Sequence, residues 1–279
     1  MNPHKPPKTG LNELLKSFLK NRKLIYKMAR REVLGRYRGS MLGLAWSFFN
    51  PLLMLVIYTF FFSMVVKTRW GGEATGDHLP QSEFAVMLFS GLIIHGLFSE
   101  CINRAPTLIT SNVNYVKKVV FPLEILPWVG LSAALFHAFI SVTVLLIIQL
   151  IIAEKIAITA LLFPIVITPL LIFTLGVMWM LSAIGVYVRD IAQITSMLSS
   201  VLLFLSPVFF PLSALSPRLK SIAMWNPLTL IIEESRKVLI LDEIPNWGYI
   251  GVYCVLAIVM AWVGFYWFQK IKKGFADVL

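Results

Sequence analysis

Charged side chains are scarce in this chain, at 14% of its 279 residues, while 58% of the residues are hydrophobic. A soluble domain carries about 25% charged residues, so this composition is typical of a polytopic membrane protein. Nowhere does a Gly-Lys pair precede Ser or Thr, the ending of the loop that cradles nucleotide phosphates. We therefore expect a membrane protein that does not itself bind ATP in the usual way.

Cysteine and buried charge are also rare. Cys101 and Cys254 are the only two cysteines, and the topology derived below puts them near opposite membrane faces, so we expect no disulfide. Neither cysteine has the spacing of a metal site. The apolar runs lack the chains of Asp, Glu and Arg that are typical of ion-coupled transporters. A multi-span protein with neither energy source of its own needs an external one.

The basic residues are concentrated at the two ends of the chain. Eleven of the 25 Lys and Arg residues precede Met41, and three more lie in the last ten positions. This distribution indicates membrane orientation and contact with anionic headgroups, and no nucleic-acid-binding motif accompanies it. The basic N-terminal region is too long for a cleavable signal peptide. By the positive-inside rule, both ends are expected in the cytoplasm.

Six apolar stretches are predicted to cross the membrane. The first has 26 residues without a charge, which as a helix would measure about 39 Å against about 30 Å of hydrocarbon. Six spans put 18 Lys and Arg residues inside and seven outside, whereas a seventh span would move the basic tail outside. The predicted spans are residues 41–66, 83–104, 123–152, 156–188, 191–210 and 247–268.

The fold class is thus an all-α membrane protein with an additional N-terminal helix. Residues 11–31 have helical period, with basic residues mainly off the apolar face. This pattern favours an amphipathic helix in the headgroup layer; a solvated helix docked on a partner is the alternative. We therefore divide the chain into residues 1–31, a cytoplasmic tail with this interfacial helix, and residues 32–279, the six-span domain.

Shorter helices are expected between some of the spans. After span five, Ser216-Pro217 and Asn226-Pro227 predict two short re-entrant helices. Residues 105–121, after span two, are too polar to cross the membrane and predict a short cytoplasmic helix. Glu100 and Arg104 are four positions apart, so we expect them to pair with each other at the inner end of span two.

One stretch carries a family resemblance. Residues 35–55 read GRYRGSMLGLAWSFFNPLLML and are followed by Tyr58 and Phe62-Ser63. This stretch resembles the first-span signature of type-2 ABC export permeases for bacterial polysaccharides, a family of O-antigen, capsule and teichoic-acid exporters. Less specific matches follow along most of the chain: Val188-Arg189-Asp190-Ile191, Leu205-Ser206-Pro207-Val208, Asn226-Pro227 with Arg236, and Lys272-Lys273-Gly274-Phe275.

The resemblance implies a non-enzymatic transport subunit in a bacterial inner membrane. Two copies of the chain would assemble with two copies of an ATP-binding subunit, which would bind the ATP and Mg²⁺. No cofactor, metal or nucleic acid is expected on this chain. The substrate would be a lipid-linked polysaccharide, with O-antigen as the first choice, then capsule, then teichoic acid.

The resemblance also implies a channel between the two permease copies, lined mainly by spans one and five. Aromatic rings suit this role because sugars stack on them through their C–H surfaces, but the same rings could instead face lipid or the protein core. The channel candidates are Trp46, Phe49, Tyr58, Phe60, Phe61, Ser199 and Phe204.

Two further groups of residues have expected roles on the cytoplasmic side. Arginine pairs bidentately with phosphate, so Arg31, Arg36 and Arg38 are candidates to hold a lipid diphosphate at the inner mouth; ordinary headgroup anchoring is the alternative. The loop after span two resembles a coupling helix that docks on the ATPase. Its candidate coupling residues are Asn112, Asn114, Tyr115 and Lys117.

Other functions account for the sequence less well. An ABC permease for a small hydrophobic molecule or drug is the alternative within transport. An intramembrane glycosyltransferase would need clustered carboxylates or an Asp pair for a diphosphate, and the chain has none. A membrane scaffold would leave the first-span signature without a role. Stimulation of the ATPase by lipid-linked glycan, but not by drugs, would separate the two transport functions.

Overall fold

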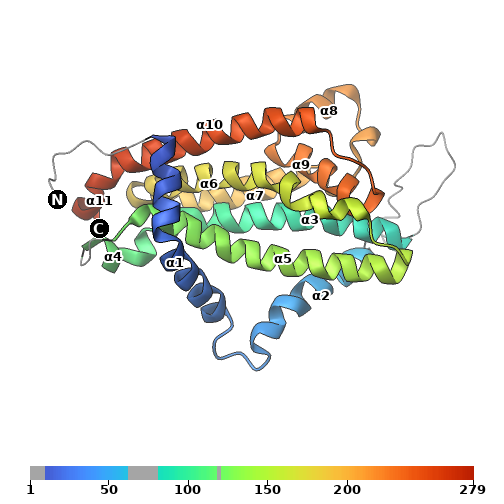
Figure 1. The fold of residues 1–279 in the computed structure, drawn as a ribbon, viewed down its shortest axis with the longest axis horizontal. Coiled ribbons are helices and arrows are strands. Elements are labelled where there is room, and N and C mark those ends of the chain that lie inside the picture. The colour runs from blue at the N-terminus through green and yellow to red at the C-terminus, as the bar shows by residue number, and fades with distance from the viewer. Residues whose placement is uncertain (1–9, 62–80, 118–120) are drawn as a thin grey trace.

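The computed structural model describes residues 10–61, 81–117 and 121–279, and within these ranges the chain forms helices and no strand (Figure 1). Its α-helices are α1 (Leu11–Arg36), α2 (Trp46–Phe60), α3 (Gln81–Arg104), α4 (Val113–Lys117), α5 (Leu126–Ala153), α6 (Phe163–Tyr187), α7 (Ile191–Leu205), α8 (Pro217–Met224), α9 (Pro227–Arg236), α10 (Trp247–Ile271) and α11 (Phe275–Val278). The expectation of an all-helical chain is confirmed for these residues.

Four helical stretches of the described residues are long and apolar enough to cross a membrane. They are Phe84–Thr107, Leu123–Ala153, Ile158–Tyr187 and Trp247–Val278. These stretches correspond to predicted spans two, three, four and six. The helices of predicted spans one and five are apolar but shorter, at Gly43–Tyr58 and Ile191–Leu205. The last residues of predicted span one, 62–66, lie outside the described residues.

Helix α7 is shorter than the span predicted for it. The prediction continued to residue 210, but α7 ends at Leu205 after 15 residues, and Ser206 is extended with ψ of 154°. Pro207 explains the end, because a proline disfavours helical backbone at the residue before it. At 1.5 Å per residue, α7 measures about 22 Å, less than the hydrocarbon thickness of about 30 Å.

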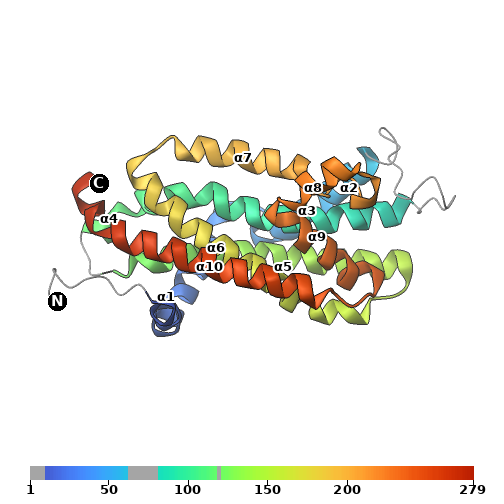
Figure 2. The same ribbon diagram turned by 90° about the horizontal axis from the view of Figure 1, so that it is seen from above.

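Helix α3 forms the centre of the bundle. Figures 1 and 2 show it running lengthwise among α5, α6 and α7. In the stretch Phe84–Thr107, 78% of the most apolar window is buried inside the protein. Leu88, Ile94 and Ile102 are among its fully buried side chains. A helix that is apolar on all sides is expected in such a position, because it has packing partners all round.

The backbones of helices α6 and α10 are in contact at two glycines. A Cβ built on Gly264 would lie only 2.1 Å from the carbonyl oxygen of Gly176, and one on Gly176 would lie 2.6 Å from the backbone of Met260. Small residues allow this backbone contact, which is a common source of helix association in membranes. Gly251, on the same helix α10, has open space around it.

Two short helices, α8 and α9, lie where the sequence predicted re-entrant helices. Asn226 caps α9 by accepting a 2.9 Å hydrogen bond from the backbone N–H of Leu228, and Pro227 occupies the first turn, where its missing N–H costs nothing. The side chain of Arg236 at the end of α9 is buried, with 3% exposure. It donates to the carbonyls of Met87 and Val208 at 3.1 Å each, and so ties α9 to α3 and to the segment after α7.

Candidate functional site

Helix α1 packs its apolar face on the start of α5. Ile25 and Ala29 are buried in a small cluster with Ile125 and Val129. Nearby, the rings of Phe18 and Trp128 lie 4.5 Å apart. The helix continues to Arg36, beyond the predicted end at residue 31. The amphipathic pattern therefore predicted the helix, and the additional turn brings further charged residues against the spans.

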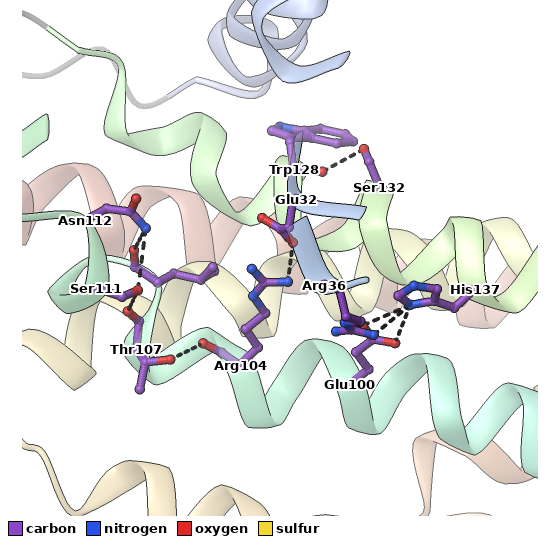
Figure 3. Close-up of polar contacts among 11 residues, drawn as sticks. Glu32, Arg36, Glu100, Arg104, Thr107, Ser111, Asn112, Trp128, Ser132 and His137 are labelled. Carbon is purple, nitrogen blue, oxygen red and sulfur yellow. Dashed lines mark hydrogen bonds and ion pairs between the residues drawn. The ribbon is translucent and has the colours of Figure 1, made fainter. Parts of the chain in front are cut away.

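Two ion pairs connect this additional turn to α3 (Figure 3). Arg36 Nη2 lies 2.6 Å from Glu100 Oε1, and Glu32 pairs with Arg104. On each helix a glutamate precedes an arginine by four residues, so the two acids and two bases stand one above the other on facing surfaces. We call Glu32, Arg36, Glu100 and Arg104 the charge ladder. It holds the end of α1 against α3.

His137 of α5 joins the charge ladder from a third helix. Its Nδ1 lies 3.2 Å from both carboxylate oxygens of Glu100 and 2.9 Å from Nη1 of Arg36. With a proton on Nδ1 the ring donates to Glu100; without one, Nδ1 accepts from Arg36. Burial raises the pKa of the Glu32 carboxyl, while Arg104 beside it favours the ionised form. The ladder thus concentrates interacting charges at the junction of α1, α3 and α5.

The charge ladder corrects one expectation from the sequence. Glu100 and Arg104 were expected to pair with each other, but each pairs with α1 instead. Glu32 was missed, and His137 was expected only as a packing or channel residue, without a charged partner. A signal for Glu32 existed, because it is one of only two acidic residues that precede Met41, in a region with 11 basic ones. No sequence signal connected His137 with Glu100, since they belong to different spans.

The three arginines expected at the inner mouth have different surroundings. Arg36 is engaged in the charge ladder, although its side chain remains 44% exposed. Arg31 donates a 2.9 Å hydrogen bond to the hydroxyl of Tyr115. Arg38 is exposed and, with Arg31, lines an open groove of about 990 Å³ along α1. These two arginines therefore face a basic groove, while Arg36 is turned toward the spans.

The loop after span two is a series of short helical turns that ends in α4. Asn112 donates to the carbonyl of Leu108 at 2.9 Å (Figure 3), and Asn114 is exposed. Tyr115 stacks on Phe121 with ring centroids 4.5 Å apart, in addition to its bond with Arg31. Lys117 donates to the backbone carbonyl of Leu279. The four coupling candidates thus lie on one segment, which contacts both α1 and the end of the described chain.

The aromatic channel candidates lie mostly at exposed positions. Four of them are on α2 or directly after it, and Phe204 is on α7. Their exposed fractions are 41% for Trp46, 47% for Phe49, 58% for Phe60, 45% for Phe61 and 68% for Phe204. Side chains of this size at these exposures leave a large apolar surface that the rest of the described residues does not cover.

Ser199 and Tyr58 have different positions from the other channel candidates. Ser199 is 3% exposed, and its hydroxyl shares a 2.5 Å hydrogen bond with that of Ser99 on α3. His95 also bonds to the carbonyl of Ser199, at 3.0 Å. Ser199 therefore packs α7 against α3 and adds nothing to the exposed surface of α7. Tyr58 is half-buried and lines a cavity of about 320 Å³ that also reaches Glu100 and His137.

Comparisons with known proteins show the family of this chain. Residues 23–240 match the ABC-2 type transporter family. The O-antigen export system permease protein RfbA of Myxococcus xanthus is 27% identical over 95% of this chain and 98% of its own length. An RfbA of Klebsiella pneumoniae is 24% identical over 92% of this chain and 95% of its own. The polysialic acid transport protein KpsM of Escherichia coli is 26% identical over 84% and 88%, respectively. Since the family match includes the end of α1, the spans that it contacts and the α8–α9 pair, the chain belongs to the ABC-2 type transporter family.

Proposed function

We propose that this chain is the membrane-spanning subunit of an ATP-driven exporter that moves a lipid-linked glycan out of the cytoplasm. Two copies would form the channel, and two copies of a separate subunit would bind ATP and Mg²⁺. The chain would cross the bacterial inner membrane six times, with both termini in the cytoplasm. O-antigen is the first choice of glycan, because two relatives carry the name of O-antigen export permeases.

The observation that carries this proposal is the exposed aromatic surface of α2 in a member of this transporter family. Trp46, Phe49 and Phe60 are 41%, 47% and 58% exposed, so their rings are available to a second copy of the chain and to a substrate. A second copy of the chain would cover part of this surface, and a sugar polymer would pass along the remainder. Each ring offers one weak stacking surface, so the polymer can slide from ring to ring.

A route for energy coupling follows from the contacts of α4. ATPase movement that displaces this segment would pull on α1 through the bond between Tyr115 and Arg31. From α1 the movement would reach α3 and α5 through the charge ladder and His137. The spans that line the channel pack on α3, so an ATPase at one end could change the channel by this route.

The aromatic channel is tested by export with the ATP-binding partner present. We expect the double variant Phe60→Ala, Phe61→Ala to lower export strongly, and either single change to lower it modestly, while abundance and melting temperature are unchanged. Phe139→Ala on α5 is the matched control, because Phe139 is also exposed, at 72%, but lies on a helix outside the proposed channel. Normal export by the double variant, or a defect that follows from loss of the protein, would refute the channel.

The substrate class has a separate test. The complex of this chain with its ATP-binding partner should hydrolyse ATP faster when lipid-linked glycan is present, and small hydrophobic drugs should cause no such stimulation. Stimulation by drugs alone would replace glycan export with drug export as the function.

A further inference from the structure

An apolar crevice lies between α1 and α5, on the side of α1 next to the basic groove. It has a volume of about 580 Å³ and lies among the side chains of Phe18, Ile25, Val33, Leu34, Leu44 and Phe136, among others. Three of these side chains, Leu34, Leu44 and Phe136, are 43%, 43% and 37% exposed. In a membrane-spanning protein, an apolar crevice beside an interfacial helix is a place for a hydrocarbon chain.

The crevice and the basic groove share one edge. Arg22, Tyr26, Arg30 and Leu34 line both of them. These residues are four apart, so they form a row along α1 with one helical turn between neighbours. A molecule at this edge would have an apolar surface on one side and cationic side chains on the other.

The charge of the groove favours a negatively charged molecule at this edge. Six basic residues line it and no acidic residue does: Arg22, Lys23, Lys27, Arg30, Arg31 and Arg38. An anionic headgroup is attracted to a basic cluster of this kind at the cytoplasmic surface. Arginine favours phosphate in particular, because its planar fork donates two parallel hydrogen bonds.

We propose that the α1–α5 crevice binds an anionic phospholipid of the inner leaflet, with an acyl chain in the crevice and the phosphate at Arg22 and Arg30. Such a lipid would fill the space between α1 and α5, and so support the position of α1 on the bundle. The inference rests on the proposed function only in placing α1 at the cytoplasmic membrane surface. Its test uses no export, so the two can fail separately.

The test measures which lipids the purified full-length chain retains. The chain is reconstituted in nanodiscs with equal amounts of phosphatidylglycerol and phosphatidylcholine that carry the same acyl chains, and the lipids that remain bound are identified by native mass spectrometry. We expect selective retention of phosphatidylglycerol. The double variant Arg22→Gln, Arg30→Gln should reduce this retention about tenfold, because it removes both phosphate ligands at the shared edge.

The matched control is Lys23→Gln, Lys27→Gln. These lysines are exposed like the two arginines, and their replacement removes the same charge. They line the basic groove but not the crevice. The control should therefore retain phosphatidylglycerol selectively. Equal loss in both double variants would mean diffuse attraction to the basic helix, which would overturn the proposed site.

Two further variants of the experiment test the crevice itself and the identity of the lipid. Ser132 of α5 lines the crevice, so Ser132→Phe should displace the lipid with no change of charge; if this variant does not fold, the arginine variant still decides the question. Undecaprenyl diphosphate, added as a competitor, should not displace phosphatidylglycerol at equal concentration. If undecaprenyl diphosphate displaces phosphatidylglycerol, the crevice binds an isoprenoid diphosphate instead. If phosphatidylcholine is retained equally well, the crevice has no site for an anionic headgroup. Either result would overturn the proposal.

Discussion

Removal of Arg36 should destabilise the protein more than removal of its partner Glu100. The side chain of Glu100 is 23% exposed and that of Arg36 is 44% exposed. In Arg36→Gln, the carboxylate of Glu100 keeps His137 but loses its cation in a largely buried position. In Glu100→Gln, the guanidinium of Arg36 can turn toward water or headgroups. The asymmetry of exposure therefore sets the order of the two effects.

The size of each effect follows from this burial. Loss of one partner costs about 3–5 kcal/mol when the pair is fully buried and about 0–1 kcal/mol when it is exposed. We expect about 2 kcal/mol for Arg36→Gln, since Glu100 lies between these limits. For Glu100→Gln the loss should be at most about 1 kcal/mol, because solvent screens the more exposed Arg36. The double variant should cost less than the sum, with an interaction energy of about 1 kcal/mol.

Equilibrium unfolding in mixed micelles measures these free energies, and limited proteolysis of α1 shows whether the helix detaches. Arg38→Gln is the control, because it removes the same charge two residues away at an exposed position in the basic groove. It should change the free energy of unfolding by less than about 0.5 kcal/mol. The reasoning is refuted if Arg36→Gln costs no more than this control, or if the double variant costs the full sum of the two single changes.

The other predictions concern helix packing and coupling. Gly264→Ala should lower the free energy of unfolding by about 1–3 kcal/mol, because its Cβ would collide with Gly176. Its control, Gly251→Ala, should leave the free energy of unfolding unchanged, because Gly251 has open space around it. Equal effects of the two variants would exclude close backbone packing as the cause. Arg236→Met should cost about 3–5 kcal/mol, since it leaves the carboxylate of Glu233 without its partner and two carbonyls without a donor. Arg218→Met, at an exposed position of α8, is its control, and a similar small loss in both variants would contradict a stabilising role for the contacts of Arg236. Tyr115→Phe keeps the stacking on Phe121 but removes the acceptor for Arg31, so export per ATP hydrolysed should fall at unchanged membrane abundance; an unchanged ratio would move the coupling route elsewhere.

The membrane character of the chain and most of its helices could be predicted from the sequence. Apolar runs at predicted spans two, three and four became helices within about three residues of the expected bounds, and the helix of span six begins at Trp247 as expected but continues past residue 268 to Val278. Local signals sufficed there, because a helix satisfies all of its backbone hydrogen bonds within one segment. Asn226-Pro227 likewise predicted the start of α9, since a cap and a first-turn proline act on neighbouring residues. The early end of α7 also has a local signal in the sequence, in Pro207.

The site depended more on contacts between distant segments. The exposed positions of Phe60 and Phe204 agree with a surface role, but Ser199, on the same helix as Phe204, faces α3 and bonds to Ser99. A sequence gives the spacing of residues on one helix and not the direction in which that helix is turned. The rotation of α7 is decided by its packing on α3.

The sequence by itself determined that this protein is helical, spans a membrane with a basic N-terminal helix, and has the signature of an export permease. It also contains two Glu-Arg pairs at a spacing of four residues, of which only Glu100 and Arg104 were expected to pair, with each other. Only the tertiary structure decided that Glu32 pairs with Arg104 and Arg36 with Glu100. The physical reason is distance: a charge interacts with whichever partner comes nearest in space, and residues 64 or more positions apart meet only once the helices have packed.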